Sequence, residues 1–203
     1  LSSIPERLEL LETQGIDMQV IASVPKQCYY MAKGEDANKV SRLVNDGIMK
    51  WVDAHPDKFV GLGTVPLQDL SIALDTLDYI KNETSIKGLQ ILTNVNGMEI
   101  SDKSLEKFWA KVEEYEFGVM LHPLGFSHGE RFGNYYFTNV IGNPLDTTVA
   151  LHYIIFNGLL ERYPNLKILG VHGGGFLPAY SGRIDHAWGA RKDSFGNLPN
   201  PPT

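Results

Sequence analysis

Two histidines occupy equivalent places in this sequence, each at the end of an apolar run. His172 follows residues 166–171 and precedes the three glycines 173–175, and His122 closes the run 117–122. Such runs are typical of buried parallel strands, and glycines let backbone approach a ligand closely. Imidazoles at strand ends can bind a metal or transfer protons. The alternative for His172 is a tight strand-to-helix turn in which the ring only hydrogen-bonds a carbonyl.

The elements that would position these histidines alternate along the chain. We expect strands over 18–24, 59–65, 86–92, 117–122 and 166–171, and helices over 3–15, 36–55, 70–82, 104–115, 146–163 and 177–191. Without an Asn-Gly hairpin signal between alternating segments, this order predicts a parallel sheet with right-handed crossovers. A Rossmann nucleotide site is excluded, because His172 and Pro178 occupy positions that its fingerprint reserves for glycine. Two histidines at strand ends favour an α/β barrel.

Local signals give the expected helix ends and faces. Ser3 and Glu6 have capping-box spacing, and Asp36 and Asp146 are expected N-caps of their helices. The long segment 123–144, rich in glycine and aromatic residues, is expected to cover the site. Apolar residues at helical spacing predict the buried face of the second helix, namely Val40, Leu43, Val44, Ile48, Trp51 and Val52.

Composition limits the class of protein. The 203 residues are 43% hydrophobic and 21% charged, which is typical of one globular domain. A net charge of −6 without a basic cluster argues against nucleic acid as a partner, and no apolar run reaches the ~20 residues that span a bilayer. The single cysteine, Cys28, favours a reducing cytoplasmic compartment. Cys28 is expected to be a small buried hydrophobe, with a nucleophile as the alternative.

Several motifs together carry a family resemblance. The chain resembles the aminocarboxymuconate semialdehyde decarboxylase branch of the amidohydrolase superfamily over nearly its whole length. The motifs are residues 15–20, Asn45-Asp46, 55–59, Leu121-His122-Pro123, 164–168, 171–175 and 182–188.

The resemblance implies a metal-dependent (β/α)₈ TIM barrel with one divalent metal, usually zinc. His122 matches the metal ligand of the fifth strand, and His172 matches the acid/base histidine of the sixth. Arg183 matches an arginine that binds a substrate carboxylate in the neighbouring subunit's site, which implies a homodimer. The sequence has no His-x-His, and 203 residues is short of the ~250 of a complete barrel. We therefore expect residues 1–203 to be a single domain, an internal portion of the barrel that covers about strands 2 to 6.

Each further assignment has a plainer alternative. Arg183 is otherwise a partner in a surface salt bridge, Arg131 a solvated loop residue, and His186 a packed residue of the last helix. At the level of function, we expect a metal-dependent decarboxylase acting on an unsaturated or aromatic carboxylate. The alternatives are a hydrolase or hydratase of the same superfamily, or a catalytically silent fragment.

Overall fold

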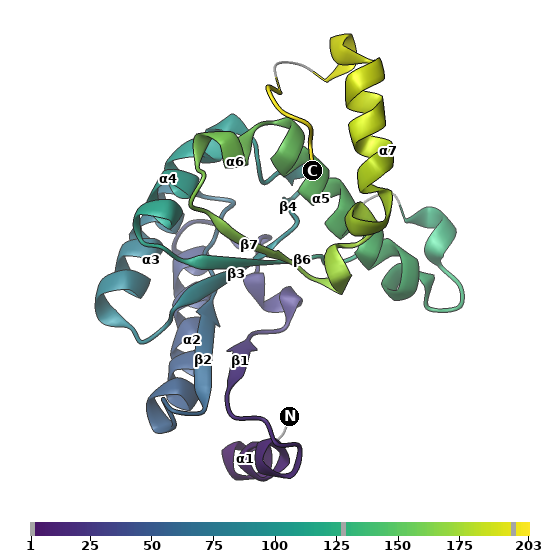
Figure 1. The fold of residues 1–203 in the computed structure, drawn as a ribbon. Helices are drawn as coiled ribbons and strands as arrows, with labels where there is room; N and C mark the ends of the chain where they lie inside the picture. The colour runs from purple at the N-terminus through teal and green to yellow at the C-terminus, as the bar shows by residue number, and fades with distance from the viewer. Residues whose placement is uncertain (1–2, 127–128, 196–197) are drawn as a thin grey trace. The chain divides into compact units, whose positions relative to one another are not determined.

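The computed structural model describes residues 3–126, 129–195 and 198–203 (Figure 1). It divides into two compact units, Leu1–Gln90 and Ile91–Thr203, and each is described by itself. The expected single domain stays a prediction. His128, in the segment expected to cover the site, lies outside the described residues. No helix within the described ranges is both long and apolar enough to cross a bilayer.

The first unit contains three parallel strands in the order β1-β2-β3. Its elements are α1 (Ile4–Thr13), β1 (Gln19–Ala22), the 3₁₀ helix η1 (Pro25–Cys28), α2 (Gly34–Ala54), β2 (Phe59–Gly63), α3 (Leu70–Glu83) and β3 (Gly88–Leu92), whose last two residues belong to the second unit. In register, Gln19 pairs with Phe59 and Leu62 with Gly88.

The second unit pairs β6 with β7 in parallel, from Gly118↔Lys167 to Leu121↔Gly170. Its elements are β4 (Asn94–Val95), β5 (Met98–Glu99), η2 (Lys103–Leu105), α4 (Glu106–Glu114), β6 (Gly118–His122), η3 (Glu130–Phe132), the π-helical η4 (Thr138–Gly142), α5 (Asn143–Phe156), α6 (Leu159–Arg162), β7 (Lys167–Gly170), η5 (His172–Gly174), α7 (Leu177–Ala190) and η6 (Lys192–Ser194).

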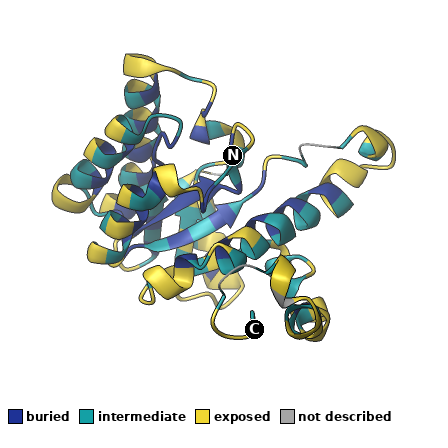
Figure 2. Ribbon diagram, turned by 90° about the horizontal axis from the view of Figure 1, so that it is seen from above, coloured by how far each residue is buried: buried dark blue, intermediate teal, exposed yellow. Residues whose placement is uncertain are grey.

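Several expected features of the core are confirmed. Ser3 and Glu6 form the capping box of α1. The apolar spacing of the helix expected over 70–82 also predicts that Ala73, Leu77 and Ile80 face inward, and all three are fully buried in α3. Figure 2 shows how helices bury one face and expose the other. All five residues of β3 are buried, as a strand covered on both faces requires.

The expected start and face of α2 are partly wrong. The helix begins at Gly34 with Lys33 as its N-cap, so Asp36 lies inside the first turn. Ile48 and Val52 are buried as expected, but Leu43 is 61% exposed. Instead the buried stripe includes Asn45, whose amide accepts from the Thr64 N–H at 2.8 Å and donates to its carbonyl at 3.1 Å.

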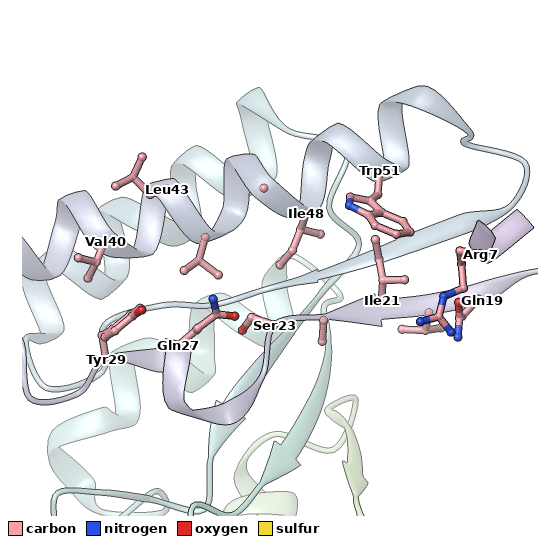
Figure 3. Close-up of a pocket in the computed structure, with 14 residues that line it drawn as sticks. Arg7, Gln19, Ile21, Ser23, Gln27, Tyr29, Val40, Leu43, Ile48 and Trp51 are labelled. Carbon is pink, nitrogen blue, oxygen red and sulfur yellow. The ribbon is translucent and has the colours of Figure 1, made fainter. Parts of the chain in front are cut away.

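A groove of about 680 Å³ runs between α2 and β1 in the first unit (Figure 3). Val40, Val44 and Trp51, expected in the core, line this groove, and Trp51 lies beside Ile21 of β1. The apolar pattern of α2 therefore marks two surfaces, a buried stripe and a groove wall.

The loop after β3 contains a hairpin that the sequence analysis did not predict. Strands β4 and β5 pair antiparallel around Asn96 and Gly97, whose φ angles are +53° and +90°. Two central residues with positive φ are typical of a type I′ turn, for which Asn-Gly is the preferred pair. The expectation that no Asn-Gly hairpin occurs was therefore wrong.

The helix expected over 146–163 is divided in two. It begins at Asn143, and Asp146 is a buried residue of its first turn rather than the N-cap. It ends at Phe156 because Gly158 takes a left-handed conformation with φ +65° before α6 begins. This earlier start brings Asp146 and Thr147 into the candidate site.

Candidate active site

His122 is the last residue of β6, and its ring is held by its own chain. The ring Nδ1 lies 2.8 Å from the carbonyl oxygen of Pro123. Because a carbonyl oxygen only accepts, Nδ1 carries the proton and Nε2 of the neutral ring keeps its lone pair. A metal-binding histidine commonly has this arrangement, with its second nitrogen donating to a carbonyl.

His172 follows β7 after one residue and begins a tight turn. Its φ is +56°, a left-handed conformation uncommon for a residue with a side chain. The turn is closed by bonds from Gly174 N–H to the Val171 carbonyl at 3.1 Å and from Gly175 N–H to the His172 carbonyl at 3.0 Å. Such a conformation costs roughly 1–3 kcal/mol and occurs often at functional sites.

The third of the glycines after His172 lets α5 approach the turn. All three have positive φ. A Cβ on Gly175 would overlap Thr148 Oγ1 and the Pro144 carbonyl oxygen, both in the first turns of α5. The Phe176 N–H donates to Thr148 Oγ1 at 2.8 Å. The turn and the start of α5 are therefore built as one unit.

The two imidazoles lie edge to face. Their centroids are 5.3 Å apart and their planes make an angle of 73°. Burial, and then the neighbouring His122, lower the pKa of His172 below its ordinary value. Both causes favour the neutral ring, which can accept a proton. The structure therefore brings these two histidines together, whereas their chemical roles stay predictions.

Three polar residues at the start of α5 and the end of β3 were not predicted as part of the site, and one of them contacts His172. Thr147 Oγ1 lies 3.3 Å from His172 Nδ1, and the adjacent Asp146 accepts a short hydrogen bond from Thr93. Burial raises the pKa of Asp146, and hydrogen bonds from Thr93 and Asn94 offset part of this rise. Thr93 directly follows β3, and its position at a strand end, like the positions of the two histidines, was the signal available in the sequence.

The other candidate arginines and histidine lie on the surface. Arg183, Arg131 and His186 are all exposed, so the packed interpretation of His186 is wrong. In the described part of the chain, no hydrogen bond or ion pair joins Arg183 to another residue, so its salt-bridge alternative is not seen. Cys28 is 2% exposed and burial raises the pKa of its thiol, which fits a small buried hydrophobe.

His122 suits one position of a metal site. Its Nε2 is the free nitrogen of a ring that Pro123 orients. Within the ranges that the structure describes, no group of three His, Cys, Asp or Glu side chains is placed to hold a metal ion. The described residues therefore offer a ligand but not the three or four that bind zinc tightly.

Solved structures confirm the class of fold. A 5-carboxyvanillate decarboxylase from Sphingomonas paucimobilis matches 98% of this chain and 60% of its own, with 26% identity and a TM-score of 0.88. A dihydroxybenzoic acid decarboxylase from Polaromonas sp. JS666, with bound manganese and 2-nitroresorcinol, matches all of this chain and 63% of its own, with 23% identity and a TM-score of 0.84. The fold is the α/β architecture of the metal-dependent hydrolase barrels, as expected.

Sequence comparison then gives the family. The amidohydrolase family model matches residues 2–193, so the chain belongs to the amidohydrolase family. It is 35% identical over 187 residues to a 2-amino-3-carboxymuconate-6-semialdehyde decarboxylase of Dictyostelium discoideum. That match covers 92% of this chain and 52% of the relative. The chain thus spans about half the length of this curated relative.

Proposed function

We propose that the protein is a metal-dependent carboxy-lyase that decarboxylates an unsaturated or aromatic carboxylate. The observation that carries this proposal is the edge-to-face pair of His122 and His172 at the ends of two parallel strands. One ring is suited to bind a cation, and the other stands beside it with a lowered pKa. The decarboxylases among the similar proteins support the reaction type.

His122 would hold the cation through Nε2, with zinc as the proposed metal. A bound divalent cation would supply a Lewis acid that polarises a substrate oxygen. The manganese of the Polaromonas decarboxylase supports a divalent ion in such a site, although not zinc in particular. Metal analysis of the purified protein distinguishes the two ions.

His172 would act as the acid and base. Decarboxylation breaks the bond to the carboxylate, releases carbon dioxide and leaves an electron pair on carbon, which takes up a proton. The protonated ring can deliver that proton and later regain one, and a pKa below the ordinary value of about 6.5 makes the protonated ring a stronger acid. The glycines that follow His172 carry no side chain to compete with a substrate for the space beside its ring.

Arg183 would bind the substrate carboxylate in the site of a partner subunit. Its exposed position on α7, without a bond to either histidine among the described residues, supports a role toward another molecule. A planar guanidinium binds a carboxylate through two parallel hydrogen bonds. The proposed assembly is therefore a homodimer. The single cysteine, which forms no disulfide, favours the cytoplasm.

The test is an assay of the protein supplied with zinc or manganese against a panel of unsaturated and hydroxylated aromatic carboxylates. Carbon dioxide release that a chelator abolishes and metal restores is the expected result. Addition of water or hydrolysis without carbon dioxide would instead identify a hydratase or a hydrolase. For Arg183, heterodimers of Arg183→Ala and His172→Ala subunits should regain activity, and inactive heterodimers would contradict the crossed site.

A further inference from the structure

We propose that Thr147 is the positioning residue of His172, and that its hydroxyl accepts a hydrogen bond from Nδ1–H and so leaves Nε2 as the nitrogen that exchanges protons. Thr147 is fully buried. Its Oγ1 lies 3.1 Å from the Asn143 carbonyl oxygen and 3.3 Å from His172 Nδ1. The consequence for turnover rests on the proposed function, whereas the hydrogen bond does not.

The direction of the bond follows from counting protons. A hydroxyl has one proton to donate and can accept as well. The Asn143 carbonyl oxygen can only accept, so the proton of Thr147 is used in that bond. Toward His172 the hydroxyl oxygen must then accept, and the proton between the two groups belongs to Nδ1. The reverse assignment would leave the oxygens of Thr147 and Asn143 facing each other without a proton.

This arrangement suits a ring that gains and loses protons at Nε2. The neutral ring keeps its Nδ1 proton on Thr147 and presents the lone pair of Nε2. The imidazolium has protons on both nitrogens, so the bond to Thr147 need not change during the cycle. His122 shows the same pattern, with Nδ1 donating to Pro123 and Nε2 left available.

The residues before and after Thr147 in α5 are also held by hydrogen bonds to other parts of the chain. Asp146, Thr147 and Thr148 are consecutive in the first two turns of α5, and each contacts a different residue outside the helix. Asp146 accepts from Thr93 at the end of β3, Thr147 meets His172, and Thr148 accepts from the Phe176 N–H. Three neighbouring side chains therefore fix α5 to the strand end and to the glycine turn.

The plainer interpretation is that Thr147 is a packed helix threonine bonded to the carbonyl four residues earlier. Thr76 of α3 provides that case, since it is fully buried and donates to the Ile72 carbonyl at 2.7 Å. Thr76→Val is thus the matched control for Thr147→Val. Both variants remove a buried hydroxyl of the same kind, but only one of these hydroxyls meets an imidazole.

The test is a long-range ¹H–¹⁵N correlation spectrum of the histidine rings at about pH 8, above the ordinary imidazole pKa of about 6.5. The His172 signals are assigned by their loss in His172→Ala. The wild-type ring should carry its proton on Nδ1, Thr147→Val should shift population to the Nε2–H form, and Thr147→Ser and Thr76→Val should match wild type. A wild-type ring protonated on Nε2, or an unchanged ring in folded Thr147→Val, would overturn the proposal.

Turnover gives a second, separable readout. Thr147→Val should lower kcat by about 2- to 10-fold, the effect of one neutral hydrogen bond, with KM and metal content unchanged. Thr147→Ser, which keeps the hydroxyl, should have the kcat of wild type. Absence of carbon dioxide release from wild type would count against the proposed function, and the ring spectrum would still decide the role of Thr147.

Discussion

His122 and His172 meet edge to face with ring centroids 5.3 Å apart, although they come from separate strands. The strand register explains the contact. Leu121 of β6 pairs with Gly170 of β7, so His122, the last residue of β6, lies level with Val171, and His172 is the next residue along the chain. The positive φ of His172 then turns its segment away from the strand direction. Parallel pairing and one strained residue are enough to bring the two imidazoles together.

The first prediction concerns metal content. His122→Ala should lose the metal, because it removes the ring whose Nε2 is free for coordination, while His172→Ala should keep most of it. Metal per subunit, measured after dialysis, is compared with wild type. His55→Ala, which changes a histidine of the first unit, is the control. Equal metal loss from both site variants would identify His172 as a ligand.

The second prediction concerns the glycine turn. Gly175→Ala should destabilise the protein by at least about 2 kcal/mol, because φ is +62° and the added Cβ would overlap Thr148 and Pro144. Gly182→Ala in α7 is the control, since nothing lies within 4 Å of its Cβ and its backbone is helical. Urea unfolding measures both. Equal stability of the two variants would show that the turn does not have this conformation.

The third prediction concerns Asn45. Asn45→Ala should cost about 2–4 kcal/mol, since the N–H and carbonyl of Thr64 would both lose their buried partner. The exposed Asn82→Ala in α3 should change stability by less than about 0.5 kcal/mol. Denaturant midpoints compare them. If Asn45→Ala lowered the free energy of unfolding no more than Asn82→Ala does, water or another group would have replaced the amide as the partner of Thr64.

The fourth prediction is a pH dependence that comes from Asp146. Burial raises its pKa in the folded state, and Glu99, whose own pKa is raised by burial and by Asp146, faces it. Such a group contributes stability below its ordinary pKa of 3.8 and loses this contribution as the pH rises through the folded value. Asp146→Asn keeps an acceptor for Thr93 but cannot ionise.

The stability of Asp146→Asn relative to wild type should therefore increase from about pH 4 to about pH 7. Unfolding free energies of the two proteins at matched pH values measure this, and the difference cancels the titration of remote groups. A constant difference across this range would show that Asp146 ionises in the folded state as freely as in the unfolded state.

Much of the second unit could be predicted from the sequence. The apolar runs that end at His122 and His172 correctly predict two strands, but the expectation that both are buried is wrong for β7, whose Lys167 and Leu169 are exposed. The three glycines after His172 predict a tight turn, and all three have positive φ in the structure. Both histidines therefore lie where the apolar runs predict, His122 at the end of β6 and His172 just after β7.

Other parts depend on contacts that periodicity does not contain. A buried Asn45 looks polar in the sequence, and only its two bonds to Thr64 make its burial favourable. Asp146 has the residue type of an N-cap, but its bond to Thr93, far away in sequence, takes it into the interior. Thr147 has no distinctive signal, since a helix threonine becomes part of a site only through its neighbour.

The most direct test of the proposed function is carbon dioxide release by metal-loaded wild type compared with metal-loaded His172→Ala, on the carboxylate that the substrate panel identifies. With equal metal content, turnover should fall by about 10²- to 10⁴-fold, the usual contribution of a positioned acid/base group. Turnover within a few-fold of wild type in the folded, metal-loaded variant would contradict the account, because the proton would then come from another group.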